Sequence, residues 1–274
     1  MIENVNVNSV ASIADYLEWH VLCKGPLSKS KILRVLDGIE EQIVDSAFLE
    51  LQRRIKLYGA HAPFNLKGDL ILPNGNWEEY PELMICLILS LEGVRKIPKK
   101  DDGTKLFERV SKEAIRGYLT GEAEVIGYPS EKKLNEMIDI LCKRMNEKRG
   151  CRIPSPRYKD KGVDVIAWLP HRDNRSNQIV LLIQCAAGIH FKTKKKASLR
   201  AWCDFVNWSA NPSCGISIPY LPNEKEFLEI RDDHDLVFDR IRILIGIRKN
   251  SRTERGLKKE VLSWCRNKLN KNNL

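Results

Sequence analysis

The stretch that decides the fold reads Gly162-Val163-Asp164-Val165-Ile166-Ala167-Trp168 and, after a polar turn, Ile179-Val180-Leu181-Leu182-Ile183-Gln184-Cys185-Ala186-Ala187-Gly188. Apolar runs bounded by Gly, Asp, Asn and Pro are typical of buried strands, and residues 169–177 between them are expected to form the turn. A symmetric antiparallel hairpin centred near Asn174 pairs Asp164 with Gln184. Their Cβ atoms should then lie about 5 Å apart.

Asp164 and Gln184 are therefore candidate metal ligands. A carboxylate and an amide oxygen at this separation can share one hard cation such as Mg²⁺. The segment Phe191-Lys192-Thr193-Lys194 follows the second strand, and a lysine there can stabilise an anion bound to the cation. In outline, this pattern indicates a site that cleaves phosphodiester bonds.

These residues carry a resemblance. An acid in a Gly-x-Asp-Val strand start, an amide at the end of the next strand and a lysine beyond it resemble the PD-(D/E)xK nuclease superfamily, which has the restriction-endonuclease-like fold. More narrowly, Gln184-Cys185-Ala186-Ala187-Gly188, followed by Phe191 and Lys194, resembles a branch found with bacterial anti-phage defence systems. That branch carries the string Gln-Cys-Ala-x-Gly-x-x-aromatic-x-x-Lys. The similarity covers residues 104–248.

The resemblance implies a metal-dependent endonuclease that hydrolyses DNA within a defence or restriction system and uses Mg²⁺ or Mn²⁺. RNA is an alternative substrate. In this interpretation Asp164 is the main metal ligand, Glu108 is the second carboxylate, and Gln184 is a neutral oxygen ligand or positions water. Lys194 stabilises the pentavalent phosphate or holds the attacking water. Because Gln replaces an acid, the site loses one negative charge, which favours one bound metal ion over two.

The sequence departs from the superfamily pattern at one position. Ala186 lies two residues after Gln184, where the superfamily usually has its lysine. The catalytic lysine has then moved to Lys194 or to Lys192, or the site is inactive. The alternative function is accordingly a catalytically inactive subunit that binds nucleic acid or acts as a scaffold.

Glu108 is assigned through the helix that begins at Thr104 and runs through Leu119. In the resembling families a glutamate early in this helix reaches the metal, and Leu106-Phe107-Glu108-Arg109 matches that position better than Glu113 does. A glutamate one turn into a helix can also be a solvated residue that is favourable to the helix dipole. The sequence leaves both interpretations open.

Charge is distributed unevenly along the 274 residues, whose formal net charge is +10. Residues 1–95 hold 9 Lys+Arg against 13 Asp+Glu, and the remainder holds 37 against 23. The basic part coincides with the nuclease-like part, which favours a polyanionic partner over solubility alone. The basic residues expected to contact nucleic acid are Arg152, Arg157, Lys159, Lys161, Lys192, Lys195 and Lys196. A solvated basic loop is the alternative for the first four.

The expected fold class is α/β: a restriction-endonuclease-like mixed central sheet flanked by helices, preceded by an all-α N-terminal domain. We expect residues 1–95 to form the helical domain and residues 96–274 the nuclease-like domain. Residues 59–75 are expected to be a loop or a small hairpin. The helix around Leu83–Leu89 is apolar on all sides, so it is either a central helix or an interface with a protein partner or a second copy. Asp239 and Arg240 are expected to form a local ion pair.

Missing sequence patterns give two further expectations, one on the cellular location and one on structural zinc. No run approaches 18 uncharged apolar residues, and the N-terminus does not have the pattern of a signal peptide, so we expect a cytoplasmic protein without a membrane partner. The 8 cysteines show no C-x-x-C pair, so a structural zinc site is not expected.

Overall fold

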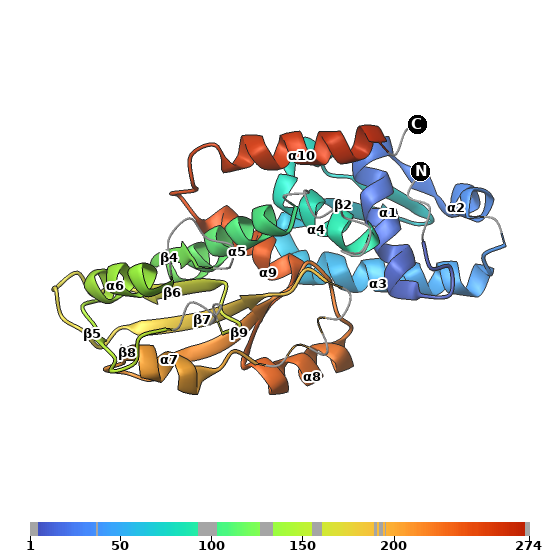
Figure 1. Ribbon diagram of the computed structural model, residues 1–274. Helices are drawn as coiled ribbons and strands as arrows, with labels where there is room; N and C mark the ends of the chain where they lie inside the picture. Colours follow the sequence, from blue (N-terminus) through green and yellow to red (C-terminus); the bar gives the residue numbers. More distant parts are fainter. Residues whose placement is uncertain are drawn as a thin grey trace.

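The computed structural model describes residues 5–36, 38–92, 103–126, 134–154, 161–188, 191, 194 and 196–271. The chain is a mixed α/β protein in which helices cover both faces of a central sheet (Figure 1). This confirms the predicted fold class at the level of an α/β protein with a mixed sheet.

The described residues form a five-stranded central sheet in the order β10-β9-β7-β6-β4. Strands β4 (Glu122–Val125), β6 (Val165–Leu169) and β7 (Ile179–Cys185) pair antiparallel. Strands β9 (Ser213–Ser217) and β10 (Leu236–Phe238) extend the sheet in parallel with β7. The short strands β5 (Lys148–Arg149) and β8 (Val206–Asn207) form a separate antiparallel pair.

The hairpin of β6 and β7 has the predicted register. Val165 pairs with Ile183 and Leu169 with Ile179, and the backbone N–H of Asp164 donates to the carbonyl of Ile183 at 2.9 Å. Continued by one residue, this register puts Asp164 opposite Gln184. Asn174, at the centre of the turn, has a φ of 57°, a conformation that Asn tolerates better than most residues.

The two strands are apolar throughout because the sheet is buried on both faces. Val165, Ala167, Leu181 and Ile183 belong to the core that includes α5 (Gly103–Leu119) and α9 (Arg240–Lys249). The alternate residues Ile166, Trp168, Val180 and Leu182 pack with α6 (Leu134–Met145) and α7 (Leu199–Phe205). A third core lies under α8 (Glu224–His234).

The N-terminal part is built from α1 (Val10–Lys24), α2 (Lys29–Val35), α3 (Glu41–Tyr58) and α4 (Pro81–Glu92), with the short 3₁₀ helices η1 (Gly59–His61) and η2 (Trp77–Glu79). It is not all-α. The described residues also form a three-stranded sheet of β1 (Leu27–Ser28), β3 (Leu70–Pro73) and β2 (Phe64–Lys67).

This small sheet has a simple local cause. Lys67 pairs with Leu70, which leaves Gly68 and Asp69 as a two-residue hairpin loop. Gly68 has a φ of 56°, as tight hairpin loops of this length require, and glycine reaches that conformation without a steric penalty. The hairpin expected as one alternative for residues 59–75 is therefore present.

Helix α4 is the central helix of the upper layer in Figure 1. It contacts α1 from the N-terminal part, and also α9 and α10 (Leu257–Lys271) from the second part. Residues 83–89 are all 2% exposed or less, so their apolar surface is covered within the chain. The predicted boundary near residue 96 lies outside the described residues, and one hydrophobic core joins α1, α3 and α4 to α5, α9 and α10.

Among the residues that the structure describes, none of the helices is both long and apolar enough to span a membrane.

Candidate active site

Asp164 is the residue that immediately precedes β6, and its carboxylate turns toward the end of β7. Its Oδ2 accepts a hydrogen bond of 2.7 Å from the backbone N–H of Cys185. This bond fixes the carboxylate beside the neighbouring strand, one residue beyond Gln184. The sequence prediction that Asp164 and Gln184 are cross-strand neighbours agrees with this geometry.

Gln184 is the second-last residue of β7, and it is 8% exposed. The carbonyl oxygen Oε1 is buried and has no hydrogen-bond partner among the described residues. A Cβ on Gly162 would lie 3.0 Å from the Gln184 amide nitrogen, so the amide packs directly against the glycine backbone. A buried oxygen without a partner is costly and indicates that something outside the described residues bonds to it.

Cys185 shows which charged groups lie near this strand end. Burial, followed by the negative charges of Asp164 and Glu108, raises the pKa of its thiol well above the usual value. A hydrogen bond with Ser111 and the positive charge of Lys194 act in the opposite direction. Three of the four predicted catalytic side chains therefore surround one residue at the end of β7, and the fourth, Gln184, directly precedes it.

Glu108 reaches this place from α5, in the second turn of the helix. Its carboxylate accepts hydrogen bonds from Lys105 Nζ at 2.8 and 3.0 Å, and it is 8% exposed. Glu113, the alternative, is fully buried between α5 and the end of α9, where Asn250 Nδ2 donates to it at 2.8 Å. The charge of Glu108 acts on Cys185, which places this glutamate at the end of β7.

Lys194 lies beyond the end of β7, and its Nζ donates a hydrogen bond of 3.1 Å to the carbonyl of Cys185. The backbone N–H of Lys194 donates to the carbonyl of Phe191 at 3.1 Å. The Phe191 ring stacks on Tyr220 at 4.8 Å between centroids, and the Tyr220 hydroxyl donates to the carbonyl of Ala187 at 2.8 Å. These contacts hold the lysine near Asp164 although it is distant from the usual position in sequence.

Ala186 occupies the position at which the superfamily usually has its lysine. Its side chain is fully buried, and its backbone N–H donates to the carbonyl of Ser217 at 2.8 Å. A lysine at this position would have to bury its charge under α8, among the apolar residues of the third core. Local packing thus accounts for alanine at 186.

The predicted nucleic-acid contacts are only partly described. Arg157, Lys159, Lys192 and Lys195 lie outside the described residues. Arg152 forms an ion pair with Asp204 at 3.2 Å, and Lys196 forms one with Asp235 at 2.6 Å. Lys161 accepts at its carbonyl a hydrogen bond from the N–H of Ser198, which connects the basic loop to the start of α7.

The sequence did not predict the residues that hold the site side chains and the neighbouring backbone in position. Lys105, three residues before Glu108, balances its charge. The hydroxyls of Ser111 and Ser217 are hydrogen-bonded at 2.8 Å and tie α5 to β9 under Cys185. Tyr220 holds the loop that carries Lys194. Only Lys105 had a sequence signal, its i,i+3 spacing from Glu108 on a helix.

The donor set fits a hard cation. Two carboxylates and an amide oxygen are the ligand types that Mg²⁺ and Mn²⁺ prefer, and Gln184 Oε1 lacks any other partner among the described residues. In the described part of the chain, no group of three or more His, Cys, Asp or Glu side chains could hold a metal ion. A cation here would therefore depend on the amide, and it would compete with Lys105 for Glu108.

Comparison of the chain with protein-family models, with curated proteins and with solved structures yields no match. The chemistry of the site consequently rests on the side chains described above.

Proposed function

We propose that this chain is a metal-dependent endonuclease that hydrolyses phosphodiester bonds in DNA, with RNA as the alternative substrate. The observation that carries the proposal is the buried, unpartnered Oε1 of Gln184 at the end of β7, next to the Asp164 carboxylate. Glu108 and Lys194 reach the same strand end from two other segments. A carboxylate pair, an amide oxygen and a lysine are the parts that such a reaction needs.

Each side chain has a distinct role in the proposal. Asp164, Glu108 and Gln184 would hold Mg²⁺ or Mn²⁺, with Asp164 the strongest ligand because its carboxylate is already oriented by the Cys185 N–H. A divalent cation supplies Lewis-acid polarisation of a phosphoryl oxygen and lowers the pKa of water. Lys194 would stabilise the negative charge that develops on the phosphate or hold the attacking water.

The fold supports the same proposal. A mixed central sheet with helices on both faces is what the resemblance to restriction-endonuclease-like proteins implies, and the similarity carries the suggestion of a defence or restriction system. A protein partner or a second copy would contact the N-terminal part, where Leu49 is 66% exposed and Leu57 is 47% exposed on α3.

A catalytically inactive, nucleic-acid-binding or scaffold subunit is the second candidate. The observation that favours it is that two charged groups of the candidate site, Lys194 and Glu108, are already hydrogen-bonded to other groups of the chain. Lys194 Nζ is bonded to the Cys185 carbonyl, and Glu108 is bonded to Lys105. Activity would require substrate or metal to compete with both contacts.

The test is nicking of supercoiled plasmid in Mg²⁺ or Mn²⁺, with any required partner present. Asp164→Ala and Lys194→Ala should each lower the rate about 10²- to 10³-fold, because each removes a group that stabilises the transition state. Affinity for DNA should change little, since many distributed basic residues supply it. Lys225→Ala is the matched control, because Lys225 is an exposed lysine on α8 that pairs with Glu229 and is not among the expected nucleic-acid contacts.

Three outcomes would distinguish the proposed site, the alternative lysine and the inactive subunit. Equal nicking by wild type and Asp164→Ala would refute the site. Activity that survives Lys194→Ala but is lost in Lys192→Ala would identify Lys192 as the catalytic lysine. No nicking by any form, with DNA binding retained, would favour the inactive subunit.

A further inference from the structure

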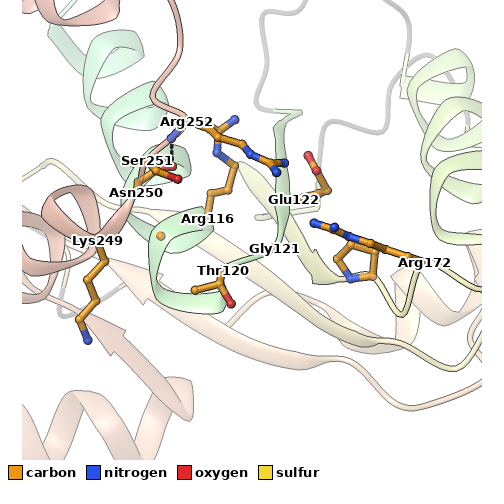
Figure 2. Close-up of a pocket in the computed structure, with 11 residues that line it drawn as sticks. Arg116, Thr120, Gly121, Glu122, Arg172, Lys249, Asn250, Ser251 and Arg252 are labelled. Carbon is orange, nitrogen blue, oxygen red and sulfur yellow. Dashed lines mark hydrogen bonds between the residues drawn. The ribbon is translucent and has the colours of Figure 1, made fainter.

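A polar recess lies at the opposite end of the sheet from Asp164. Strand β6 begins directly after Asp164 and ends at Leu169, and the recess lies beyond that end (Figure 2). It has a volume of about 140 Å³ and is formed by three segments: residues 116–122 from the end of α5 to the start of β4, the turn after β6, and the residues at and beyond the end of α9.

Close glycine contacts bring these segments together. A Cβ on Gly117 would collide with the carbonyl oxygen of Gly246, so only glycine lets α5 and α9 approach this closely. A Cβ on Gly121 would likewise collide with the carbonyl oxygen of Trp168 at the end of β6. The ends of α5, α9 and β6 therefore meet at one place, and the walls of the recess are set by backbone packing.

The recess is strongly cationic. Arg116, Arg172, Lys249 and Arg252 line it, against a single acidic lining residue, Glu122. No ion pair to Arg172, Lys249 or Arg252 occurs within the described part of the chain. Like charges brought together without counterions repel one another, and a bound anion would relieve that repulsion.

Arg116 is the lining residue whose side chain is held in place by buried neighbours. Its guanidinium forms an ion pair of 2.6 Å with the fully buried Glu113, which Asn250 also holds. The Nε of Arg116 is buried and has no hydrogen-bond partner among the described residues. Figure 2 shows Arg116, Arg172 and Arg252 approaching from three segments, whereas Lys249 extends away from them.

The ends of α5 and α9 do not by themselves account for these cations. Basic side chains near helix C-termini often serve the last carbonyl groups. Here backbone N–H groups already do so: Gly121 donates to the carbonyl of Arg116 at 3.2 Å, and Asn250 donates to the carbonyl of Ile247 at 2.9 Å. The positive charge thus exceeds what the helix ends require.

We infer that this recess binds a phosphate group. Guanidinium groups match phosphate oxygens in charge and in planar hydrogen-bonding geometry. The lining has no aromatic side chain on which a base could stack, so the ligand would be recognised through its phosphate. This second site does not depend on the proposed nuclease activity, and its ligand is either a polynucleotide backbone or a small phosphorylated molecule.

The probe for the test is inorganic pyrophosphate, titrated calorimetrically into the full chain at low ionic strength. Wild type should bind, and the double variant Arg172→Gln/Arg252→Gln should bind at least about tenfold more weakly, because charge-assisted hydrogen bonds are lost. Both residues are exposed, so the fold should survive. The matched control is Arg175→Gln/Arg255→Gln, which removes the same charge from exposed residues of the same two segments outside the recess.

The control should bind pyrophosphate within about twofold of wild type, since screened surface charges contribute little at a distance. Absence of binding by wild type, or equal weakening in both double variants, would overturn the inference. A repeat with excess duplex DNA identifies the source of the phosphate. Displacement of pyrophosphate assigns the recess to a polynucleotide backbone, and unchanged binding assigns it to a small phosphorylated ligand.

Discussion

Replacement of Arg240 by Met tests the buried charge network that joins the two parts of the chain. Arg240, at the start of α9, is fully buried, and its Nη2 lies 2.7 Å from Asp15 Oδ1 and 3.5 Å from Glu18 Oε2 on α1. Arg54 of α3 contacts the same two carboxylates at 2.7 and 3.0 Å. Without Arg240, one arginine would remain for both buried acids and for Glu50.

The size of the effect follows from two opposed contributions. Removal of one partner from a buried ion pair typically costs about 3–5 kcal/mol, because a buried charge loses its compensation. Two donor nitrogens of Arg240, Nε and Nη1, have no hydrogen-bond partner among the described residues. Their removal recovers part of a desolvation cost of about 1–3 kcal/mol each. We therefore expect the lower end of the range, a loss of about 3 kcal/mol in the free energy of unfolding.

The assay is urea unfolding followed by far-ultraviolet circular dichroism. With a denaturant slope of about 3 kcal/mol/M, the midpoint should fall by about 1 M. Arg231→Met is the control, since Arg231 is half-exposed and pairs with the exposed Asp232, and it should cost less than about 1 kcal/mol. Because one core joins the two parts, a single transition is expected. Equal costs in the two variants would refute the role of the network, and a separate early transition would indicate an independent N-terminal unit.

Three further changes test other features. Arg240 and Arg54 hold the pKa of Asp15 well below its ordinary value of 3.8 despite burial, so the stability difference between wild type and Asp15→Asn should be full above about pH 5 and shrink as the pH falls below that, measured by urea unfolding. Gly117→Ala should cost about 1–3 kcal/mol by the same measurement through its collision with Gly246, whereas Gly188→Ala, which meets no atom within 4 Å, should be tolerated. Gln184→Glu should lower the thermal midpoint without metal, because the added carboxylate repels Asp164, and Mg²⁺ should restore the midpoint by binding between them. In the control, Gln178→Glu, the midpoint should also fall because Gln178 is buried, but Mg²⁺ should not restore it.

The sequence predicted the central hairpin because side-chain alternation and turn position together fix a register. Any slip of one residue would exchange the two buried faces of β6 and β7 and move Asp164 away from Gln184. The same information placed Glu108 on a helix but could not orient it. That orientation depends on the packing of α5 against the sheet, where the hydroxyl of Ser111 on α5 is hydrogen-bonded to the hydroxyl of Ser217 on β9, 106 positions away.

Long-range contacts explain what the sequence left undecided or misassigned. The adjacent Asp239 and Arg240 suggested a local ion pair. In the structure Arg240 instead pairs with Asp15, 225 positions away, and such pairing has no local pattern. The all-α expectation for the N-terminal part was wrong because the two-residue turn at Gly68 was too short a signal to separate a hairpin from a loop.

Helix α5 carries groups of both proposed sites, but the neighbours that position them differ. Glu108 and Arg116 are eight residues apart on this helix, or about 12 Å along its axis. Glu108 acts near β7 and is balanced by Lys105, whereas Arg116 is held by Glu113 beside Gly246 and Asn250. A substitution at Gly117 would shift the end of α9 and disturb the recess while it leaves the hydrogen bond between Asp164 and Cys185 in place. The proposed phosphate recess and the candidate metal site can therefore fail independently, although both take a charged side chain from the same helix.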